Sequence, residues 1–374
     1  AGEVVELPAS VVKELVENAV DAGATAVTVR LTEGGLARID VADDGSGIPT
    51  DELELALERH ATSKIGPSDD LEGVATLGFR GEALASIASV ARVRILSRTP
   101  STESANTIQV EGGGRRKRGE GGRSVGTTVE VEGLFFNTPA RRKFLRGAAV
   151  EQLEVLRTIE HLYLARPDVA LHLLGEDREL GSYPASLELR GAAARVLGPE
   201  FLDQSFSVDA PISGKVRIRG VLGRPNLAVG NARRLFLAVN GRTIESRPIA
   251  QAVRFAFQEY IPRTRFPVGV LHLDVPAERV DVNVHPTKRE VRLSREGELV
   301  EEVRVAVRRA LQGAPALARI PDAPFGTDRS LGGTRRAPAD LGPTGRTRRT
   351  DPAAAVRALA PAAAQQRLSG SGPP

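Results

Sequence analysis

The sequence predicts an α/β protein built from two folded regions and a C-terminal tail. Helical and strand periodicities alternate up to about residue 190, and alternating strand patterns then lead into a final helical run. From Ala314 the chain is dominated by Ala, Pro, Gly, Arg and Thr, a composition that cannot bury enough apolar surface to fold. We therefore divide the chain into regions 1–192 and 193–313 and a disordered linker over 314–374.

Composition excludes several classes of protein. Of the 374 residues, 41% are hydrophobic and 26% are charged, which is ordinary for a soluble globular chain. No apolar run approaches the ~18 residues of a membrane span, and no signal peptide is visible. Because cysteine is absent, disulfides and thiolate metal sites are excluded. We therefore expect a cytoplasmic protein with no membrane contact.

The first element is an amphipathic helix over VVKELVENAVDAGA, residues 11–24. One half of it is apolar at about 100° per residue, and Pro8 and Gly23 suit its start and end. The other half carries Lys13, Glu14, Glu17, Asn18 and Asp21. Glu14 and Asn18 lie one turn apart, so their side chains are neighbours. A solvated face is the ordinary interpretation of this polar half, and the helix alone does not separate it from a chemical role.

A strand follows and ends in an acidic, glycine-rich turn within ARIDVADDGSGI, residues 37–48. Ile39 and Val41 alternate as strand residues do, and Asp43 stands where the strand ends. Glycine permits positive φ and lets a ligand approach the backbone closely. A carboxylate at this place can accept a hydrogen bond from an exocyclic amine such as that of adenine. Acid–glycine turns are also common without such a site, so a plain turn stays open.

The next stretch, residues 60–90, begins as a polar loop and passes through GFRG into the helical pattern EALASIASV. A glycine-rich turn that opens a helix leaves free N–H groups and the positive end of the helix dipole, which together can cradle a phosphate. A tightly packed loop is the alternative. Residues 126–144 then predict a strand, an aromatic-rich turn and the start of a basic helix.

The second region begins with the strand patterns KVRIRGVL and RRLFLAVNGR and ends in the helical run ELVEEVRVAVRRALQG. Before that run, Pro286 ends a strand and projects Lys288 on a loop. Lys288 is one of only six lysines among 51 basic residues. Because nearly all the basic residues of this chain are Arg, a Lys at this position indicates a need for the compact point charge of an ammonium group. A surface lysine on a turn is the alternative.

In this order and spacing, the motifs resemble the ATPase superfamily of DNA gyrase B, heat-shock chaperones, histidine kinases and MutL. Several stretches resemble the MutL family of mismatch-repair ATPases, and they lie in both folded regions: AGEVVELPASVVKELVENAVDAGA, HATSKI, LGFRGEALASI, LFFNTPARRKFL, LAVNGR and VDVNVHPTKREVR. The resemblance implies a two-layer α/β sandwich that binds ATP, with a mixed sheet and helices on one face. A ribosomal-protein-type α/β transducer domain would follow it.

The resemblance also implies roles for matching residues. Glu14 is expected to be the general base that activates water, and Asn18 to be the Mg²⁺ ligand through its side-chain carbonyl. Asp43 would read adenine, with Gly47 and Thr128 lining that pocket. The other expected nucleotide-binding residues form the phosphate cradle and the lid: Gly78, Arg80, Gly81, Glu82, Ala83, Leu84 and Lys64.

The matching lysine of the second region, Lys288, would reach the γ-phosphate and make the two regions a switch. The family couples this closure to dimerisation of its ATPase domains, which forms a clamp around DNA. We therefore expect a homodimer that hydrolyses ATP slowly. It would link mismatch recognition by MutS to a downstream repair nuclease or helicase, and it would be associated with the nucleoid during repair.

Contact with DNA is expected to be independent of base sequence. Arg247 matches a position implicated in DNA binding in the family. The segment GGGRRKRGEGGR, residues 112–123, predicts a basic tip between two strands that could meet phosphates. A solvated hairpin tip is the alternative.

Two departures from the family pattern concern the ends of the chain. The family usually has residues before the position of Ala1, and this chain begins without Met, so we expect upstream residues to have been lost. No DQHAxxE stretch occurs, so we expect no endonuclease site in this chain. Two other functions stay open. One is a non-hydrolysing, ATP-gated DNA-binding scaffold, and the other is a topoisomerase- or chaperone-type subunit that shares the ATP site.

Overall fold

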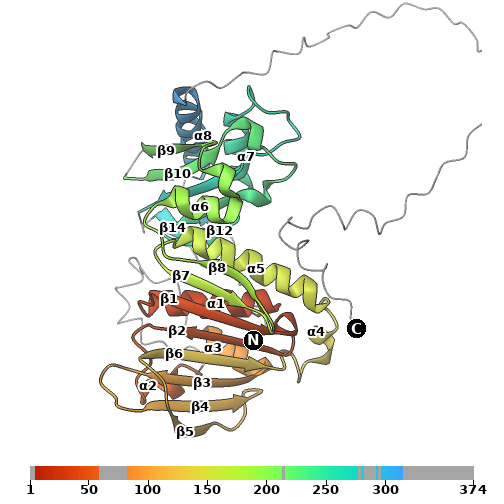
Figure 1. The fold of residues 1–374 in the computed structure, drawn as a ribbon, viewed down its shortest axis with the longest axis vertical. Coiled ribbons are helices and arrows are strands. Elements are labelled where there is room, and N and C mark those ends of the chain that lie inside the picture. Colours follow the sequence, from red (N-terminus) through yellow and green to blue (C-terminus); the bar gives the residue numbers. More distant parts are fainter. Residues whose placement is uncertain are drawn as a thin grey trace, which may run out of the picture. The chain divides into compact units, whose positions relative to one another are not determined.

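The computed structural model describes residues 5–58, 82–212, 215–276, 279–281, 292–293 and 296–314 (Figure 1). They belong to one compact unit, Ala1–Pro321. Residues 315–374 of the expected linker lie outside the described residues. So do five of the predicted site residues, which are Lys64, Gly78, Arg80, Gly81 and Lys288, and the side chain of Glu82.

An eight-stranded sheet forms the first half of the fold, in the order β5-β4-β3-β6-β2-β1-β7-β8. Its neighbouring strands are antiparallel except for the parallel pair of β1 and β7. The strands are β1 Ala26–Thr32, β2 Arg38–Asp43, β3 Arg92–Arg98, β4 Ala105–Glu111, β5 Lys117–Gly121, β6 Gly126–Glu132, β7 Ala170–Leu174 and β8 Glu179–Tyr183. This mixed sheet is the one that the sequence predicted.

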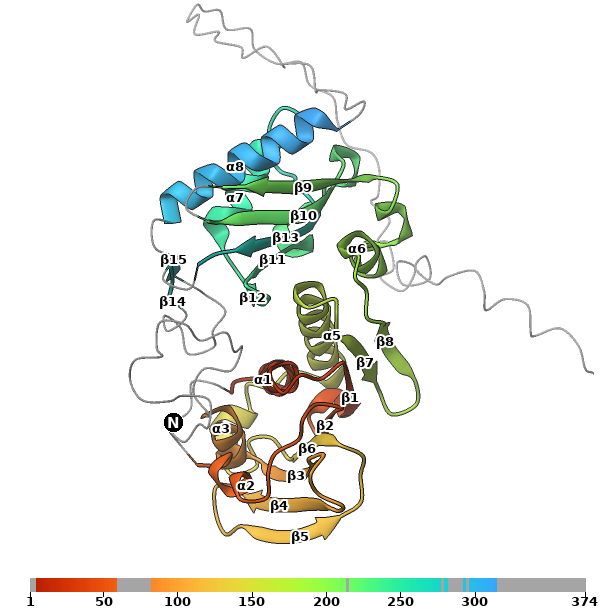
Figure 2. The same ribbon diagram turned by 90° about the vertical axis from the view of Figure 1, so that its left-hand side faces the viewer.

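A layer of helices packs on this sheet (Figure 2). It contains α1 Pro8–Asp21, α3 Glu82–Val90 and α5 Ala148–Ala165, and α1 contacts both of the others. The short helices α2 Glu52–Leu55 and α4 Pro139–Arg142 lie between strands in the sequence. Apolar side chains of the strands and helices form one core, among them Val12, Val29, Ile39, Ile95 and Ile159. The predicted two-layer sandwich is confirmed.

The first helix begins and ends as the sequence predicts, but its polar half is not solvated. Pro8 is at the first turn, and Gly23, just beyond the end, has φ +75°. Lys13, Glu14 and Glu17 are only 7%, 3% and 2% exposed. Lys13 Nζ lies 3.6 Å from Glu17 Oε1. The expectation of a solvated Glu17 was therefore wrong, whereas Asn18 and Asp21 on the same polar half are only half-buried.

A five-stranded sheet forms the second half, in the order β12-β11-β13-β10-β9. Its strands are β9 Ser205–Pro211, β10 Arg217–Gly223, β11 Leu235–Val239, β12 Arg242–Ile244 and β13 Gly269–Asp274. A separate pair is formed by β14 Val280–Asp281 and β15 Arg292–Leu293. Helices α7 Arg247–Ala256 and α8 Glu296–Gly313 pack against each other, and α8 also contacts β9.

Both faces of the second sheet are buried. Leu237 and Leu271 pack with α7 and α8, whereas their neighbours Phe236 and Val270 belong to the core of the first half. Successive residues of β11 and β13 thus pack into different cores, as expected for strands that are buried on both faces. Helix α5 contacts β11 and β12, and α6 Leu189–Leu197 contacts β10 and β13. The second region is therefore an α/β layer, as predicted, and the proposed boundary at residue 192 lies inside α6.

No helix among the described residues is both long enough and apolar enough to cross a membrane.

Candidate nucleotide site at the end of the central strands

The carboxylate of Asp43 lies at the end of β2, near the middle of the first sheet. Its Oδ1 accepts hydrogen bonds from the main-chain N–H groups of Gly45, at 2.9 Å, and Thr127, at 3.1 Å. Among the described residues, no hydrogen bond reaches Oδ2. Burial raises the pKa of Asp43 above its ordinary value, although these two N–H groups and the charge of Arg123 act in the opposite direction. One carboxylate oxygen is thus held by two main-chain N–H groups, and the other accepts no hydrogen bond from a described residue.

A buried hydroxyl connects the acid–glycine turn to the sheet beside Asp43. Ser97 on β3 is 1% exposed, and its Oγ accepts from the main-chain N–H of Ile48 at 2.7 Å. The same Oγ lies 2.9 Å from Thr127 Oγ1 and donates to the carbonyl of Gly126 at 3.2 Å. Three segments that are distant in sequence are therefore joined at one point, which fixes the floor of the site.

Gly47 is required by the packing of this turn. It has φ +75°, and a Cβ there would lie 2.2 Å from the carbonyl oxygen of Arg98. Both features exclude other residues. The sequence suggested close approach of a ligand to this backbone, whereas the approach that the structure shows is to the main chain of β3.

The second acid of the turn has a structural role. Asp44 Oδ1 accepts from the main-chain N–H groups of Thr25 and Ala26 at 2.7 and 2.9 Å, and Oδ2 accepts from the Thr25 hydroxyl at 2.5 Å. Partial burial opposes ionisation of Asp44, but these hydrogen bonds outweigh it and lower its pKa. The two adjacent acids are thus distinguished, since Asp44 anchors β1 and Asp43 faces the site.

The two helix residues predicted to act on ATP lie beside this turn. The main-chain N–H of Ser46 donates to the carbonyl of Ala22 at 2.9 Å, which attaches the end of α1 to the turn. Asn18 is half-buried in the last turn of α1, and Glu14 is buried one turn earlier. Ala83 and Leu84, in the first turn of α3, are half-buried, and α3 contacts α1. The structure thus attaches the C-terminal end of α1, the helix that carries Glu14 and Asn18, to the Asp43 turn.

Thr128 lies on the other face of the sheet from Asp43. Along β6, Thr127, Val129 and Val131 are buried toward the helices, so Thr128 between them points away. Its Oγ1 accepts from Arg123 Nη1 at 3.0 Å. Thr128 was expected to line the adenine pocket, but the residue of β6 that contacts the Asp43 carboxylate is Thr127, through its main-chain N–H. Strand parity was the signal in the sequence that could have distinguished them.

The donors that surround this site fit a nucleotide with Mg²⁺. No group of three or more His, Cys, Asp or Glu residues that could hold a metal by itself occurs in the described part of the chain. Asn18 offers one amide oxygen, a hard donor of the kind that Mg²⁺ accepts beside phosphate oxygens and water. A site with one protein ligand needs the phosphates to complete it, which is consistent with metal that enters together with ATP.

Three arginines of the basic segment 112–123 make internal contacts, although most of the segment is exposed. It contains β5, the edge strand of the first sheet, rather than a simple hairpin tip. Arg116 donates to the carbonyls of Glu54 and Leu57, and Arg118 donates to Glu54 Oε1 at 2.7 Å. Arg123 binds main-chain oxygens beside Asp43. The prediction of a basic tip free to meet phosphates is therefore corrected for these arginines.

Arg247 is exposed at the first position of α7. Ser246 caps this helix, because its side chain accepts from the main-chain N–H of Ile249 at 3.3 Å. The guanidinium is thus presented to solvent from a fixed helix start.

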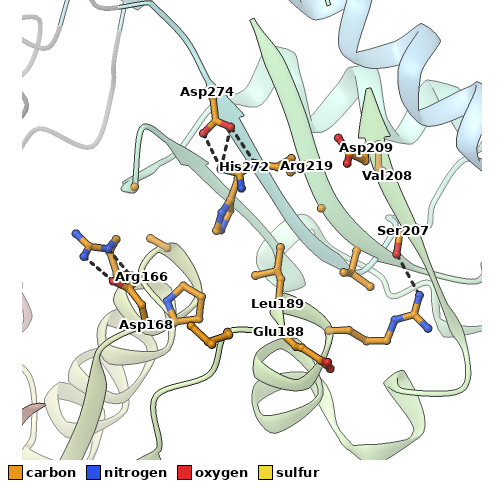
Figure 3. Close-up of a pocket in the computed structure, with 17 residues that line it drawn as sticks. Arg166, Asp168, Glu188, Leu189, Ser207, Val208, Asp209, Arg219, His272 and Asp274 are labelled. Atoms are coloured by element: carbon orange, nitrogen blue, oxygen red, sulfur yellow. Dashed lines mark hydrogen bonds and ion pairs between the residues drawn. The ribbon is translucent and has the colours of Figure 1, made fainter. Parts of the chain in front are cut away.

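A separate cavity of about 730 Å³ lies at the junction of the two halves (Figure 3). Most of the charged side chains that line it are paired. Arg166 donates through Nε and Nη2 to the two carboxylate oxygens of Asp168, and Arg219 makes the same two hydrogen bonds with Asp274. His272 Nε2 lies 2.7 Å from the carbonyl of Leu164, and burial lowers the pKa of His272. None of the predicted nucleotide-site residues lines this cavity.

Two family models match the chain. The model described as histidine kinase-, DNA gyrase B-, and HSP90-like ATPase matches residues 5–118. The model described as DNA mismatch repair protein, C-terminal domain, matches residues 193–312. The first includes the strand end with Asp43 and the helix with Glu14 and Asn18, and the second includes the five-stranded sheet.

The curated relatives that match this chain include proteins named DNA mismatch repair protein MutL. The DNA mismatch repair protein MutL of Anaeromyxobacter dehalogenans (strain 2CP-C) is 48% identical over 335 residues, which are 89% of this chain and 55% of that protein. MutL of Ralstonia nicotianae is 48% identical over 331 residues, 87% of this chain and 51% of that protein. The chain thus spans about half the length of the curated relatives that it matches.

Solved structures agree with the fold. The Aquifex aeolicus MutL ATPase domain complexed with ADP has a TM-score of 0.56 and 30% identity, and the match covers 73% of this chain and 93% of that one. The N-terminal domain of a DNA repair protein has a TM-score of 0.70 at 24% identity, over 83% of this chain and 95% of that one, and supports the fold alone. The motifs, the sheet order and these matches agree, and the chain belongs to the MutL family of DNA mismatch repair proteins.

Proposed function

We propose that this chain is the ATP-binding and hydrolysing part of a mismatch-repair factor. The observation that carries the proposal is the Asp43 carboxylate, held through Oδ1 by two main-chain N–H groups and with Oδ2 directed to no described residue. Such an acceptor at a strand end is suited to the exocyclic amine of adenine. The ADP complex of the Aquifex aeolicus relative supports a nucleotide as the ligand.

Glu14 is proposed as the general base for hydrolysis. It is 3% exposed on a helix whose end is joined to the Asp43 turn. A carboxylate within one hydrogen bond of water can take the proton released as that water attacks the γ-phosphate. Asn18, one turn further on, is proposed to hold Mg²⁺, which would neutralise phosphate charge when bound.

The remaining contacts with the nucleotide are carried over from the family resemblance. The phosphate cradle would be formed by the backbone around Gly78, Arg80, Gly81, Glu82, Ala83 and Leu84. Lys64 would act in the lid, and Gly47 would line the adenine end of the site. The main-chain N–H of Thr127, which donates to Asp43 Oδ1 in the structure, would support the same end in place of the expected Thr128. Lys288 is proposed to reach the γ-phosphate and so to couple the second region to ATP.

On this basis, we propose that ATP binding favours closure of a homodimer into a clamp on DNA, and that slow hydrolysis releases it. The expected partners are DNA, bound without sequence readout and with Arg247 as one contact, MutS, and a downstream nuclease or helicase. The resemblance to the family supports this step, together with the exposed position of Arg247 at the start of α7.

The experiment is Glu14→Ala, measured by ADP and ATP binding and by phosphate release. We expect nucleotide affinity within about threefold of the parent and hydrolysis lower by at least about 100-fold, because general-base catalysis contributes roughly 10²–10⁴. Asp21→Ala, also on the polar side of α1, is the control and should hydrolyse ATP at the parent rate. Parent-level hydrolysis by Glu14→Ala would contradict the assignment, and a parent protein that binds but never hydrolyses ATP would favour the scaffold alternative.

A further inference from the structure

We propose that Arg123 is a positioning residue of the nucleotide site, which fixes the main chain of Asp43 from the sheet face opposite the helices. The proposal deepens the proposed function and rests on it, because Asp43 is taken to read adenine.

The guanidinium of Arg123 joins the ends of three strands. Nη2 donates to the carbonyl of Asp43 at 2.7 Å, at the end of β2. Nη1 donates to the carbonyl of Leu96 on β3 at 3.2 Å and to Thr128 Oγ1 on β6 at 3.0 Å. Nε donates to the carbonyl of Ser124 at 2.9 Å. A planar fork of donors can make these bonds at once, whereas the compact ammonium of a lysine cannot.

The guanidinium of Arg123 fits beside the end of β2 because residue 126 is a glycine. A Cβ on Gly126 would lie 2.2 Å from the carbonyl oxygen of Asp43 and 2.9 Å from Arg123 Nη2. Since Gly126 has no side chain, the strand end and the guanidinium both fit there. Arg123 is itself held, because Arg98 Nη1 donates to its carbonyl at 3.2 Å. The contact is thus part of the packed structure and is distinct from the exposed cations of the same basic segment.

The bond from Arg123 acts on the aspartate that receives the ligand. The Asp43 carbonyl is held from one face, while the main-chain N–H of Thr127 holds its Oδ1. The direction of Oδ2 is set by these fixed points. Among the described residues, the charged groups that act on Asp43 are Arg123, which favours the ionised form, and Asp44, which opposes it. Loss of Arg123 therefore both releases the main chain and weakens ionisation of the carboxylate that accepts the amine.

The test compares Arg123→Gln with Arg123→Lys, by ADP and GDP titration between pH 5 and pH 8. For Arg123→Gln we expect about tenfold weaker ADP binding at neutral pH and a smaller preference for ADP over GDP. The midpoint, which is the pH at which ADP affinity has fallen halfway in acid, should lie at higher pH than in the parent. Arg123→Lys keeps the charge, so it should keep the parent midpoint but still bind ADP more weakly. The rate at saturating ATP should change little in either variant, since the effect is on binding.

Arg94→Ala is the matched control. Arg94 lies on β3 of the same sheet, where it pairs with Glu130 at 3.3 Å, a carboxylate that Arg38 also binds. This variant should keep the parent affinity and midpoint.

The outcomes separate the positioning role from the site itself. If Asp43→Asn abolishes ADP binding but Arg123→Gln keeps the parent affinity, nucleotide preference and midpoint, the positioning role is overturned and the site stands. If Asp43→Asn also leaves ADP affinity unchanged, the proposed nucleotide site fails. A purely structural role would lower the unfolding temperature of Arg123→Gln and Arg123→Lys without separating their midpoints, and that result would overturn the proposal.

Discussion

Both main-chain N–H groups that reach the Asp43 carboxylate donate to Oδ1, so its two oxygens have different surroundings. Burial raises the pKa of this carboxyl, and the next residue, Asp44, has a lowered pKa because hydrogen bonds from Thr25 and Ala26 outweigh its partial burial. Two adjacent and identical side chains thus differ in pKa, because burial dominates at Asp43 and hydrogen bonds dominate at Asp44. Such a difference in environment commonly divides a binding acid from a structural one.

The raised pKa predicts how ADP binding depends on pH. As pH falls through the pKa of Asp43, the acceptor is protonated, so affinity should decline from a higher pH than an ordinary carboxyl, near 4, would give. Calorimetric titration with ADP measures this, and Asp43→Asn should bind weakly with no such acidic decline. An affinity in the parent that declines at no higher pH than an ordinary carboxyl would give would contradict the assignment.

The raised pKa of Asp43 affects folding stability in the opposite direction from ADP binding, because it favours the folded protein at low pH. Because the folded-state pKa is raised, the contribution of Asp43 to folding is fully present below its unfolded pKa and is lost as pH rises through the folded value. Loss of ADP binding in mild acid should therefore occur without unfolding caused by this residue. Circular dichroism at each pH distinguishes the two effects.

At the scale of elements, the acid–glycine turn is held by main-chain packing as well as by hydrogen bonds. Gly47 lies against the carbonyl of Arg98, and Ser97 receives the N–H of Ile48. The turn, β3 and β6 therefore form a single rigid support, on which the position of Asp43 depends.

Gly47→Ala should destabilise the protein by about 3 kcal/mol or more, since it adds a main-chain clash to the cost of positive φ. Gly23→Ala is an internal control, because Gly23 has the same φ, +75°, but an added Cβ would meet no atom within 4 Å. It should cost only about 1 kcal/mol. Urea unfolding measures the free energy of unfolding of both variants. Equal decreases would show that the close approach of Gly47 to the Arg98 carbonyl does not determine the cost of Gly47→Ala.

The sequence predicted elements better than it predicted their surroundings. The bounds of α1 follow from Pro8, Gly23 and the apolar period, but the burial of Glu17 depends on neighbouring helices that no local pattern reports. Likewise, Asp43 could be placed at a strand end, whereas its hydrogen bond from the main-chain N–H of Thr127 is a contact between distant segments that no local pattern reports. Strand β5, KRGEG, was missed because it is polar throughout and lacks alternation.

At the scale of the whole molecule, one face of the second sheet belongs to the core of the first half. Phe236 and Val270 of the second sheet pack with residues of the first, and the ring of Phe236 meets His161 of α5 edge-on, with centroids 4.7 Å apart. His272 of β13 and the carbonyl of Leu164 make a further contact. A boundary at residue 192 is therefore a convenient division of sequence and crosses a continuous apolar interior.

Phe236→Ala should accordingly weaken both halves together, by about 3–5 kcal/mol, the usual cost of removing a buried aromatic ring. Hydrogen exchange during urea unfolding should show amides of β1 and β10 losing protection in one transition. Phe255→Ala, at a side chain that is 50% exposed on α7, is the control and should change stability little. Two separate transitions in the parent protein would contradict a shared core.

The shared helix α5 also has a consequence for synthesis on the ribosome. Its residues 148–165 leave the ribosome well before β11, β12 and β13, which contact it in the folded protein. At ~5–20 residues per second, the roughly 100 residues between the end of α5 and β13 take on the order of 5–20 s to make. During that interval, apolar groups of α5 that later meet Phe236 remain accessible to other chains. A nascent chain stalled near residue 200 should therefore bind a chaperone more strongly than one stalled beyond residue 314.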